Sequence, residues 1–97
     1  MQGDDKAVVT LRLPSTLSAF SGGKGQLVLR ADTIEELLAE LKQQYPQLWE
    51  RLCDEQGFLR PHVKMFVNNE VISGREGMDM EVTSGQEVIV LPAITHR

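Results

Sequence analysis

The residues that most directly suggest chemistry are the glycines around Lys24, in the run Gly22-Gly23-Lys24-Gly25. A phosphate-binding P-loop has the pattern G-x-x-x-x-G-K-[ST], and a helix follows it. Here Gly25 stands where that pattern requires serine or threonine, and an alternating Gln-Leu-Val-Leu segment follows in place of a helical one. We therefore expect a hairpin connection at these glycines rather than a phosphate-binding loop.

Side chains that could act as nucleophiles or metal ligands are few and scattered. His62 and His96 are the only histidines, and neither stands at a metal-ligand spacing from the single cysteine, Cys53. One cysteine cannot close an internal disulfide, and on a short helical segment this one is expected to be a half-buried, inert thiol. Three serines lie in a loop without a histidine or an acid in a nucleophile pattern: Ser15, Ser18 and Ser21. We predict no catalytic residue, no metal and no cofactor.

The composition describes an ordinary globular chain and excludes several classes of protein. Of 97 residues, 41% are hydrophobic and 25% charged, unlike a disordered or collagen-like chain, and the length fits one domain, 1–97. No apolar run approaches the roughly 20 residues of a transmembrane helix. Ten Lys and Arg against 14 Asp and Glu give a net charge of −4, which argues against nucleic acid or a membrane surface as a partner. The acidic start, Met-Gln-Gly-Asp-Asp-Lys, is unlike a signal peptide, so we expect a cytoplasmic protein.

Hydrophobic periodicity indicates the elements that position these residues, beginning with a hairpin. Segment 7–13 alternates between apolar and polar residues until Pro14 ends it, because proline cannot donate to a strand ladder. Residues 14–25 lose this period and are expected to form a flexible connection. Segment 26–31 alternates again, so the two segments predict paired strands.

A helix follows the hairpin. Thr33 and Glu36 form a capping box, in which the hydroxyl accepts an amide and the carboxylate reaches back. An apolar stripe at helical spacing runs from Ile34 to Tyr45, and Pro46 ends the helix near Gln44. A second, shorter helical turn is expected within 46–54. We interpret four acids on the main helix as a solvated face rather than a metal site: Asp32, Glu35, Glu36 and Glu40.

Strands return in the second half of the chain. Residues 63–68 alternate, Asn68-Asn69 tolerates the positive φ of a tight hairpin turn, and a short return strand begins at Val71-Ile72. A loop over 73–85 leads into the last strand, 86–91. The order β-β-α-β-β-β predicts an α+β domain with one main helix on one face of a mixed sheet of four or five strands.

The same alternation places apolar side chains on the face of the sheet away from the helix. These residues are Val8, Phe66, Ile89 and Leu91. A domain with a single helix has nothing left to cover that face, and adjacent exposed apolar residues mark a docking surface. Scattered exposed apolar residues, by contrast, are common on ordinary surfaces. We favour a partner-binding face, because Phe66 and Leu91 are large.

Five segments carry a family resemblance through their order and spacing. They are 9–13, 32–34, 63–70, 84–88 and the closing Val-Leu-Pro-Ala-Ile of 90–94. Together they resemble the ubiquitin-like β-grasp sulfur carriers of the MoaD/ThiS family over 8–97, nearly the whole chain. The long first loop and the turn after the helix look most like the branch that includes the cysteine-synthesis sulfur carrier and the molybdopterin-synthase small subunit.

The resemblance implies a β-grasp fold and sulfur carriage in cofactor (molybdopterin-type) or cysteine biosynthesis. In that family a ubiquitin-activating-like adenylyltransferase adenylates the terminal Gly-Gly carboxylate with ATP. The carboxylate then becomes a thiocarboxylate, which delivers its sulfur to an accepting enzyme. The resemblance thus implies these two enzymes as partners that dock on the apolar sheet face. The carrier end would be a flexible tail from about residue 92: Pro92, Ala93, Ile94, Thr95, His96 and Arg97.

The tail departs from the family at its last two residues. His96 and Arg97 stand where Gly-Gly is expected, and no Gly-Gly lies between the last strand and Thr95. Side chains here should obstruct a channel shaped for bare backbone. Three readings stay open: the protein has lost sulfur transfer, it is activated at an unusual terminus, or the chain is a variant or a cut form. The alternative function is a non-conjugating ubiquitin-like module that binds partners through its sheet face or its tail.

Overall fold

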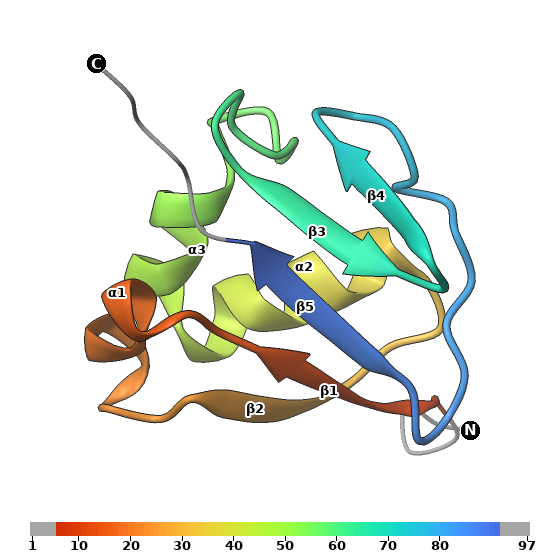
Figure 1. The fold of residues 1–97 in the computed structure, drawn as a ribbon, viewed down its shortest axis with the longest axis horizontal. Helices are drawn as coiled ribbons and strands as arrows, with labels where there is room; N and C mark the ends of the chain where they lie inside the picture. The colour runs from red at the N-terminus through yellow and green to blue at the C-terminus, as the bar shows by residue number, and fades with distance from the viewer. Residues whose placement is uncertain (1–5, 92–97) are drawn as a thin grey trace.

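The computed structural model describes residues 6–91, which contain five strands and three α-helices, with all the helices before β3 in the chain (Figure 1). The strands are β1 (Val8–Arg12), β2 (Gln26–Arg30), β3 (Lys64–Val67), β4 (Glu70–Ser73) and β5 (Glu87–Leu91). The helices are α1 (Ser15–Ser18), α2 (Ile34–Gln44) and α3 (Pro46–Leu52), and a 3-10 turn, η2 (Ala19–Ser21), follows α1. α2 and α3 confirm the main helix and the shorter helical turn that the sequence predicts. Pro46 lies at the start of α3, where proline fits a first helical turn.

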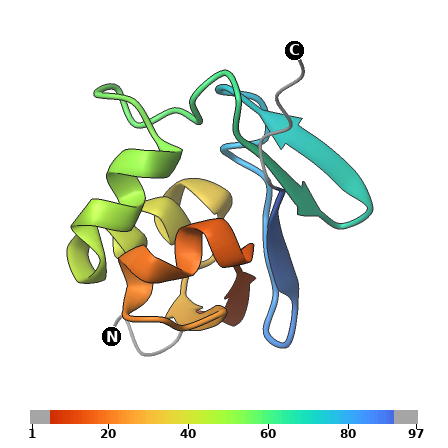
Figure 2. The same ribbon diagram turned by 60° about the vertical axis from the view of Figure 1, so that its left-hand side comes forward.

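All five strands form one mixed sheet in the order β2-β1-β5-β3-β4. β1 and β5 are parallel, and every other neighbouring pair is antiparallel. In Figure 2 the helices lie together on one side of this sheet. The predicted α+β class and mixed sheet are therefore confirmed, and β5 lies between β1 and β3.

The connection between β1 and β2 differs from the prediction of a flexible, aperiodic loop. It contains α1 and η2, so the described chain has three α-helices rather than one main helix and a short turn. Pro14 is the N-cap of α1, and its carbonyl accepts from the Leu17 amide at 2.9 Å. Leu17 and Phe20, one turn apart, pack partly buried against the core. Two apolar residues give too short a stripe to register as a helical period, which is why the sequence pattern missed these turns.

The start of α2 is capped by its own side chains. The Glu36 amide donates to the Thr33 hydroxyl at 3.2 Å, as the capping box predicts. The Glu36 carboxylate reaches back one residue beyond the usual partner and accepts from the Asp32 amide at 2.9 Å. It also meets the Lys6 ammonium at 2.9 Å, which ties the segment before β1 to the helix.

The long segment between β4 and β5 completes this cap. The Ile34 and Glu35 amides, which have no partner within the helix, donate to the carbonyls of Met80 and Met78 at 3.0 and 2.8 Å. The Val82 amide donates in return to the Asp32 carbonyl at 3.0 Å. This segment therefore binds the start of α2 through its backbone, although its side chains show little apolar pattern.

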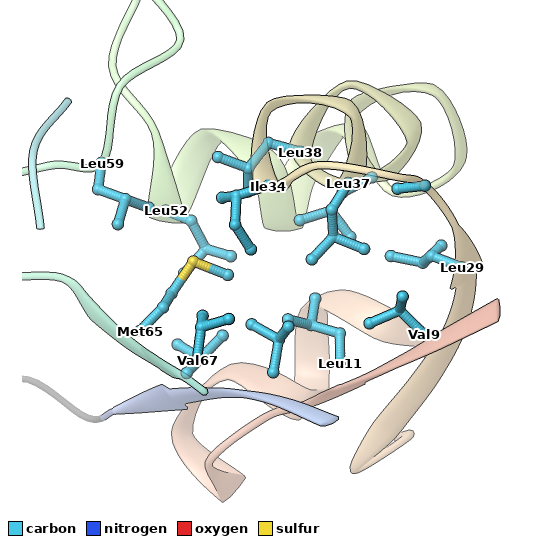
Figure 3. Close-up of a cluster of buried hydrophobic side chains, with 14 of the residues drawn as sticks. Val9, Leu11, Leu29, Ile34, Leu37, Leu38, Leu52, Leu59, Met65 and Val67 are labelled. Carbon is cyan, nitrogen blue, oxygen red and sulfur yellow. The ribbon is translucent and has the colours of Figure 1, made fainter. Parts of the chain in front are cut away.

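The core lies between the helices and the inner face of the sheet. In Figure 3, Ile34, Leu37 and Leu38 of α2 point toward side chains of the strands, among them Val9 and Leu11. All five are at most 3% exposed. The residues that the helical stripe and the strand alternation predict to face the core are therefore buried.

The β3–β4 hairpin also follows the sequence. Asn68 and Asn69 have φ values of 52° and 66°, the left-handed region that a two-residue hairpin turn requires and that asparagine tolerates. The turn fixes the register of the hairpin, so that Phe66 lies opposite Val71 and Val67 opposite Glu70.

Candidate functional site

The outer face of the sheet carries a row of apolar side chains across three strands. Ile89 at the middle of β5 pairs with Phe66 of β3, and Phe66 pairs with Val71 of β4. Leu91 lies two residues beyond Ile89 and therefore on the same face. Phe66, Ile89 and Leu91 are half-buried and Val71 is 54% exposed. We call Phe66, Val71, Ile89 and Leu91 the sheet-face patch.

Within the described residues, no helix covers this patch, because the helices lie on the other side of the sheet (Figure 2). Charged side chains border it on the same face. Arg12 pairs with Ile89 across β1 and β5 and forms an ion pair with Glu87 at 3.4 Å, while Lys64 lies opposite Leu91. An apolar centre with a polar rim is the arrangement that protein interfaces share.

Val8 lies apart from the other three residues of the predicted face. It is 36% exposed and pairs with Arg30 of β2, whereas Ile89 pairs with Arg12, four residues further along β1. At roughly 3.3 Å per residue, this separation is about 13 Å along the strand. The structure therefore brings together Phe66, Ile89 and Leu91, and it places Val8 near the opposite end of the sheet.

The sequence prediction missed Val71, although a signal for it was present. A two-residue turn at Asn68-Asn69 forces positions 67 and 70, and then 66 and 71, to face each other. Carrying the alternation of β3 through this turn places Val71 beside Phe66. Val28 of β2, 61% exposed, is a separate apolar residue on the same face, opposite Thr10.

The predicted carrier end follows the sheet-face patch directly. β5 ends at Leu91, and residues Pro92, Ala93, Ile94, Thr95, His96 and Arg97 lie outside the described residues. Beside Leu91 lies a hollow of about 260 Å³. We call it the tail-root hollow; its lining is Thr16, Leu17, Arg51, His62, Val63, Val90 and Leu91.

The glycine-rich segment and the single cysteine are both structural in the described part of the chain. The Gly22–Lys24 region joins η2 to a strand and not to a helix, which confirms the hairpin connection. Cys53 is fully buried, more than the half-burial predicted, and desolvation raises the pKa of its thiol to about 12. A thiol that is so strongly protonated is a poor nucleophile.

The remaining polar groups give no metal site in the part of the chain that the structure describes. No three His, Cys, Asp or Glu side chains among residues 6–91 gather as metal ligands would. The buried Ser21 hydroxyl lies 2.9 and 2.8 Å from the carbonyl oxygens of Ser18 and Lys24, so it is a structural donor. No helix in the described part is both long and apolar enough to cross a membrane.

Comparison with known proteins gives the family. The ThiS family model matches residues 11–95, most of the chain. The chain therefore belongs to the ThiS family, as the MoaD/ThiS resemblance of its segments indicates.

Individual relatives agree with this assignment. The sulfur carrier protein CysO of Mycobacterium tuberculosis is 30% identical over 88 residues, which span 89% of this chain and 95% of that protein. The putative sulfur carrier protein of Archaeoglobus fulgidus is 31% identical over 88 residues, covering 89% of this chain and 94% of the relative.

Solved structures show the same β-grasp fold. The crystal structure of Mycobacterium tuberculosis CysO has a TM-score of 0.76 at 30% identity and covers 89% of this chain and 99% of that one. A chain of the Amycolatopsis orientalis BexX/CysO complex has a TM-score of 0.78 at 25% identity, covering 92% of this chain and 99% of that one. The predicted β-grasp architecture is confirmed.

Proposed function

We propose that this protein is a cytoplasmic sulfur carrier of the CysO/ThiS/MoaD type, which serves cysteine or molybdopterin-type cofactor biosynthesis through its C-terminal tail. The observation that carries the proposal is the similarity to CysO, at 30% identity over nearly the full length of both proteins. The absence of a metal cluster or a reactive thiol among residues 6–91 is compatible with a protein that other enzymes act upon.

The proposed chemistry takes place at the terminal carboxylate. In the first step, a carboxylate oxygen attacks the α-phosphorus of ATP and pyrophosphate leaves, which forms an acyl-adenylate. In the second step, sulfide attacks the acyl carbon and AMP leaves, which forms a thiocarboxylate. In the third step, the thiocarboxylate sulfur attacks the substrate of an accepting enzyme, and water then cleaves the acyl carbon–sulfur bond and restores the carboxylate. The carrier therefore supplies a presented end group and no catalytic side chain.

The sheet-face patch is the proposed docking surface for both enzymes. Phe66, Ile89 and Leu91 form one cluster, and Leu91 is the last described residue before the tail. A partner held on this patch would therefore have the start of the tail directly beside it. Large side chains in the centre of an interface contribute most of its binding free energy.

A specific feature favours a second candidate function. His96 and Arg97 stand at the positions where the MoaD/ThiS resemblance leads us to expect Gly-Gly. A chain that cannot enter the channel of an activating enzyme could still bind through the sheet-face patch, as a non-conjugating ubiquitin-like module. The two functions differ in whether ATP changes the terminal carboxylate.

An activation assay separates the two functions. The wild-type chain and the double variant His96→Gly, Arg97→Gly would each be incubated with the ubiquitin-activating-like adenylyltransferase of the same organism and ATP, and pyrophosphate release measured. A carrier predicts ATP-dependent release that the glycine variant increases. No release from either chain, with binding intact in a titration, would overturn the carrier function and leave the module.

A further inference from the structure

We propose that the tail-root hollow receives an acidic segment of the activating adenylyltransferase, in which an apolar side chain fills the hollow and neighbouring carboxylates meet Arg51 and His62. This inference rests on the proposed function. It identifies a second contact region beside the sheet-face patch, and it assigns a charge to the partner surface there.

The hollow forms where separate parts of the chain meet. Leu17 comes from α1, Arg51 from α3, His62 from the connection before β3, and Leu91 from the end of β5. In Figure 1, α1 and α3 lie beside the tip of β5. The helical turn that the sequence pattern missed thus supplies one wall, and the last described residue before the tail supplies another.

The size and lining of the hollow suit a protein side chain. Pockets for small molecules and cofactors span roughly 300–1,000 Å³, and this hollow holds about 260 Å³. Leu17, Val63 and Val90 give it an apolar lining, and Arg51 and His62 add nitrogen donors. An apolar residue next to an aspartate or glutamate would match both features.

Arg51 is the charged side chain among the described lining residues, and the neighbouring Glu50 does not line this hollow but a separate one that it shares with Arg51. None of the described lining residues carries a carboxylate, while Arg51 is exposed, with its guanidinium 4.5 Å from the centre of the Phe20 ring. Lys64 lies opposite Leu91 and extends the positive region onto the sheet face. Opposite charges across an interface steer association and fix orientation.

The net charge of −4 conceals this local polarity. Acidic residues at the start of α2 lie at the other end of the sheet, where Lys6 contacts Glu36 and the Ala7 amide donates to Asp32 at 3.1 Å. That end holds the start of β1. Because β5 runs parallel to β1, its last residue, Leu91, lies at the opposite end.

A charge-reversal titration tests the proposal. The probe is the adenylyltransferase of the same organism, titrated calorimetrically against Arg51→Glu and against a matched control, Arg75→Glu. Arg75 is also exposed and stacked on an aromatic ring, with its guanidinium 4.9 Å from the Phe58 ring centre, but it does not line the hollow. We expect Arg51→Glu to weaken binding about tenfold at low salt, and Arg75→Glu to leave it within twofold.

Two further variants make the outcomes distinct. Arg51→Lys keeps the charge and should retain most of the affinity, which separates a charge effect from loss of the ring contact. Phe66→Asp tests the sheet-face patch. Binding that is lost in Phe66→Asp but unchanged in Arg51→Glu would overturn this inference and leave the carrier function standing. Equal losses in Arg51→Glu and Arg75→Glu would also overturn it. A wild-type chain that does not bind would overturn the carrier function itself.

Discussion

At the scale of single residues, Glu36 makes two interactions, the helix cap and an ion pair, and only the cap could be predicted from the sequence. Its carboxylate accepts from the Asp32 amide and pairs with Lys6. The hydrogen bond from Lys6 is the main cause that lowers the pKa of Glu36, and the hydrogen bond from the Asp32 amide lowers it further. The hydrogen bond between Lys6 and Glu36 also raises the pKa of Lys6. The capping box was predictable because both partners are local, whereas Lys6 lies 30 residues away and meets the helix only in the folded chain.

The lowered pKa of Glu36 predicts a pH-dependent contribution to stability. A carboxyl whose pKa falls on folding stabilises the fold at pH values above its unfolded pKa, and the effect is lost as the pH falls through the folded pKa. We expect Glu36→Gln to be slightly less stable than wild type at pH 7, with the gap closing below about pH 4. Urea unfolding at several pH values measures this gap. A gap that is constant with pH would contradict the assignment.

At the scale of elements, the segment between β4 and β5 shows how a loop without an apolar pattern can be well determined. Its backbone supplies the carbonyl partners for the first amides of α2. Gly77 of this segment has a φ of +79°, and a Cβ placed on it would lie 2.6 Å from the Ile72 Cγ2 atom. Ile72 is a core residue with 3% exposure, so it has little room to move.

A pair of glycine substitutions tests this contact. Gly77→Ala should cost roughly 1–2 kcal/mol for its backbone conformation and about 1–3 kcal/mol more for the clash with Ile72. Gly85→Ala is the matched control, because Gly85 has a φ of +87° and nothing within 4 Å of its added Cβ, so it should cost only the first term. Thermal or urea unfolding gives both values. Equal losses would show that the clash relaxes freely.

The elements that could be predicted from sequence are those with a clear local pattern of residue types. α2 and the strands follow long, regular apolar patterns that tertiary contacts then reinforce. The Asn68-Asn69 turn was predictable because its conformation suits few residue types. α1 and η2 were missed because Leu17 and Phe20 alone give too short an apolar stripe, and the contact of η2 with α3 forms only in the folded chain.

At the scale of the whole molecule, the sequence predicts which side chains share the outer face of the sheet, but not which of them lie next to one another. Strand alternation identified which side chains point away from the helices. It could not place Val8 apart from Ile89, because that separation depends on the parallel register of β1 and β5. The tail-root hollow was not predictable at all, since its walls come from four segments distant in sequence.

The central claim, that the protein carries sulfur on its terminal carboxylate, is tested most directly by the intact mass of the protein recovered from its native host, with the C-terminal peptide sequenced. The carrier function predicts a fraction in which one terminal oxygen is replaced by sulfur, increased when the adenylyltransferase, ATP and a sulfur donor are added. A plain carboxylate that stays unchanged under those additions would contradict it and favour a binding module.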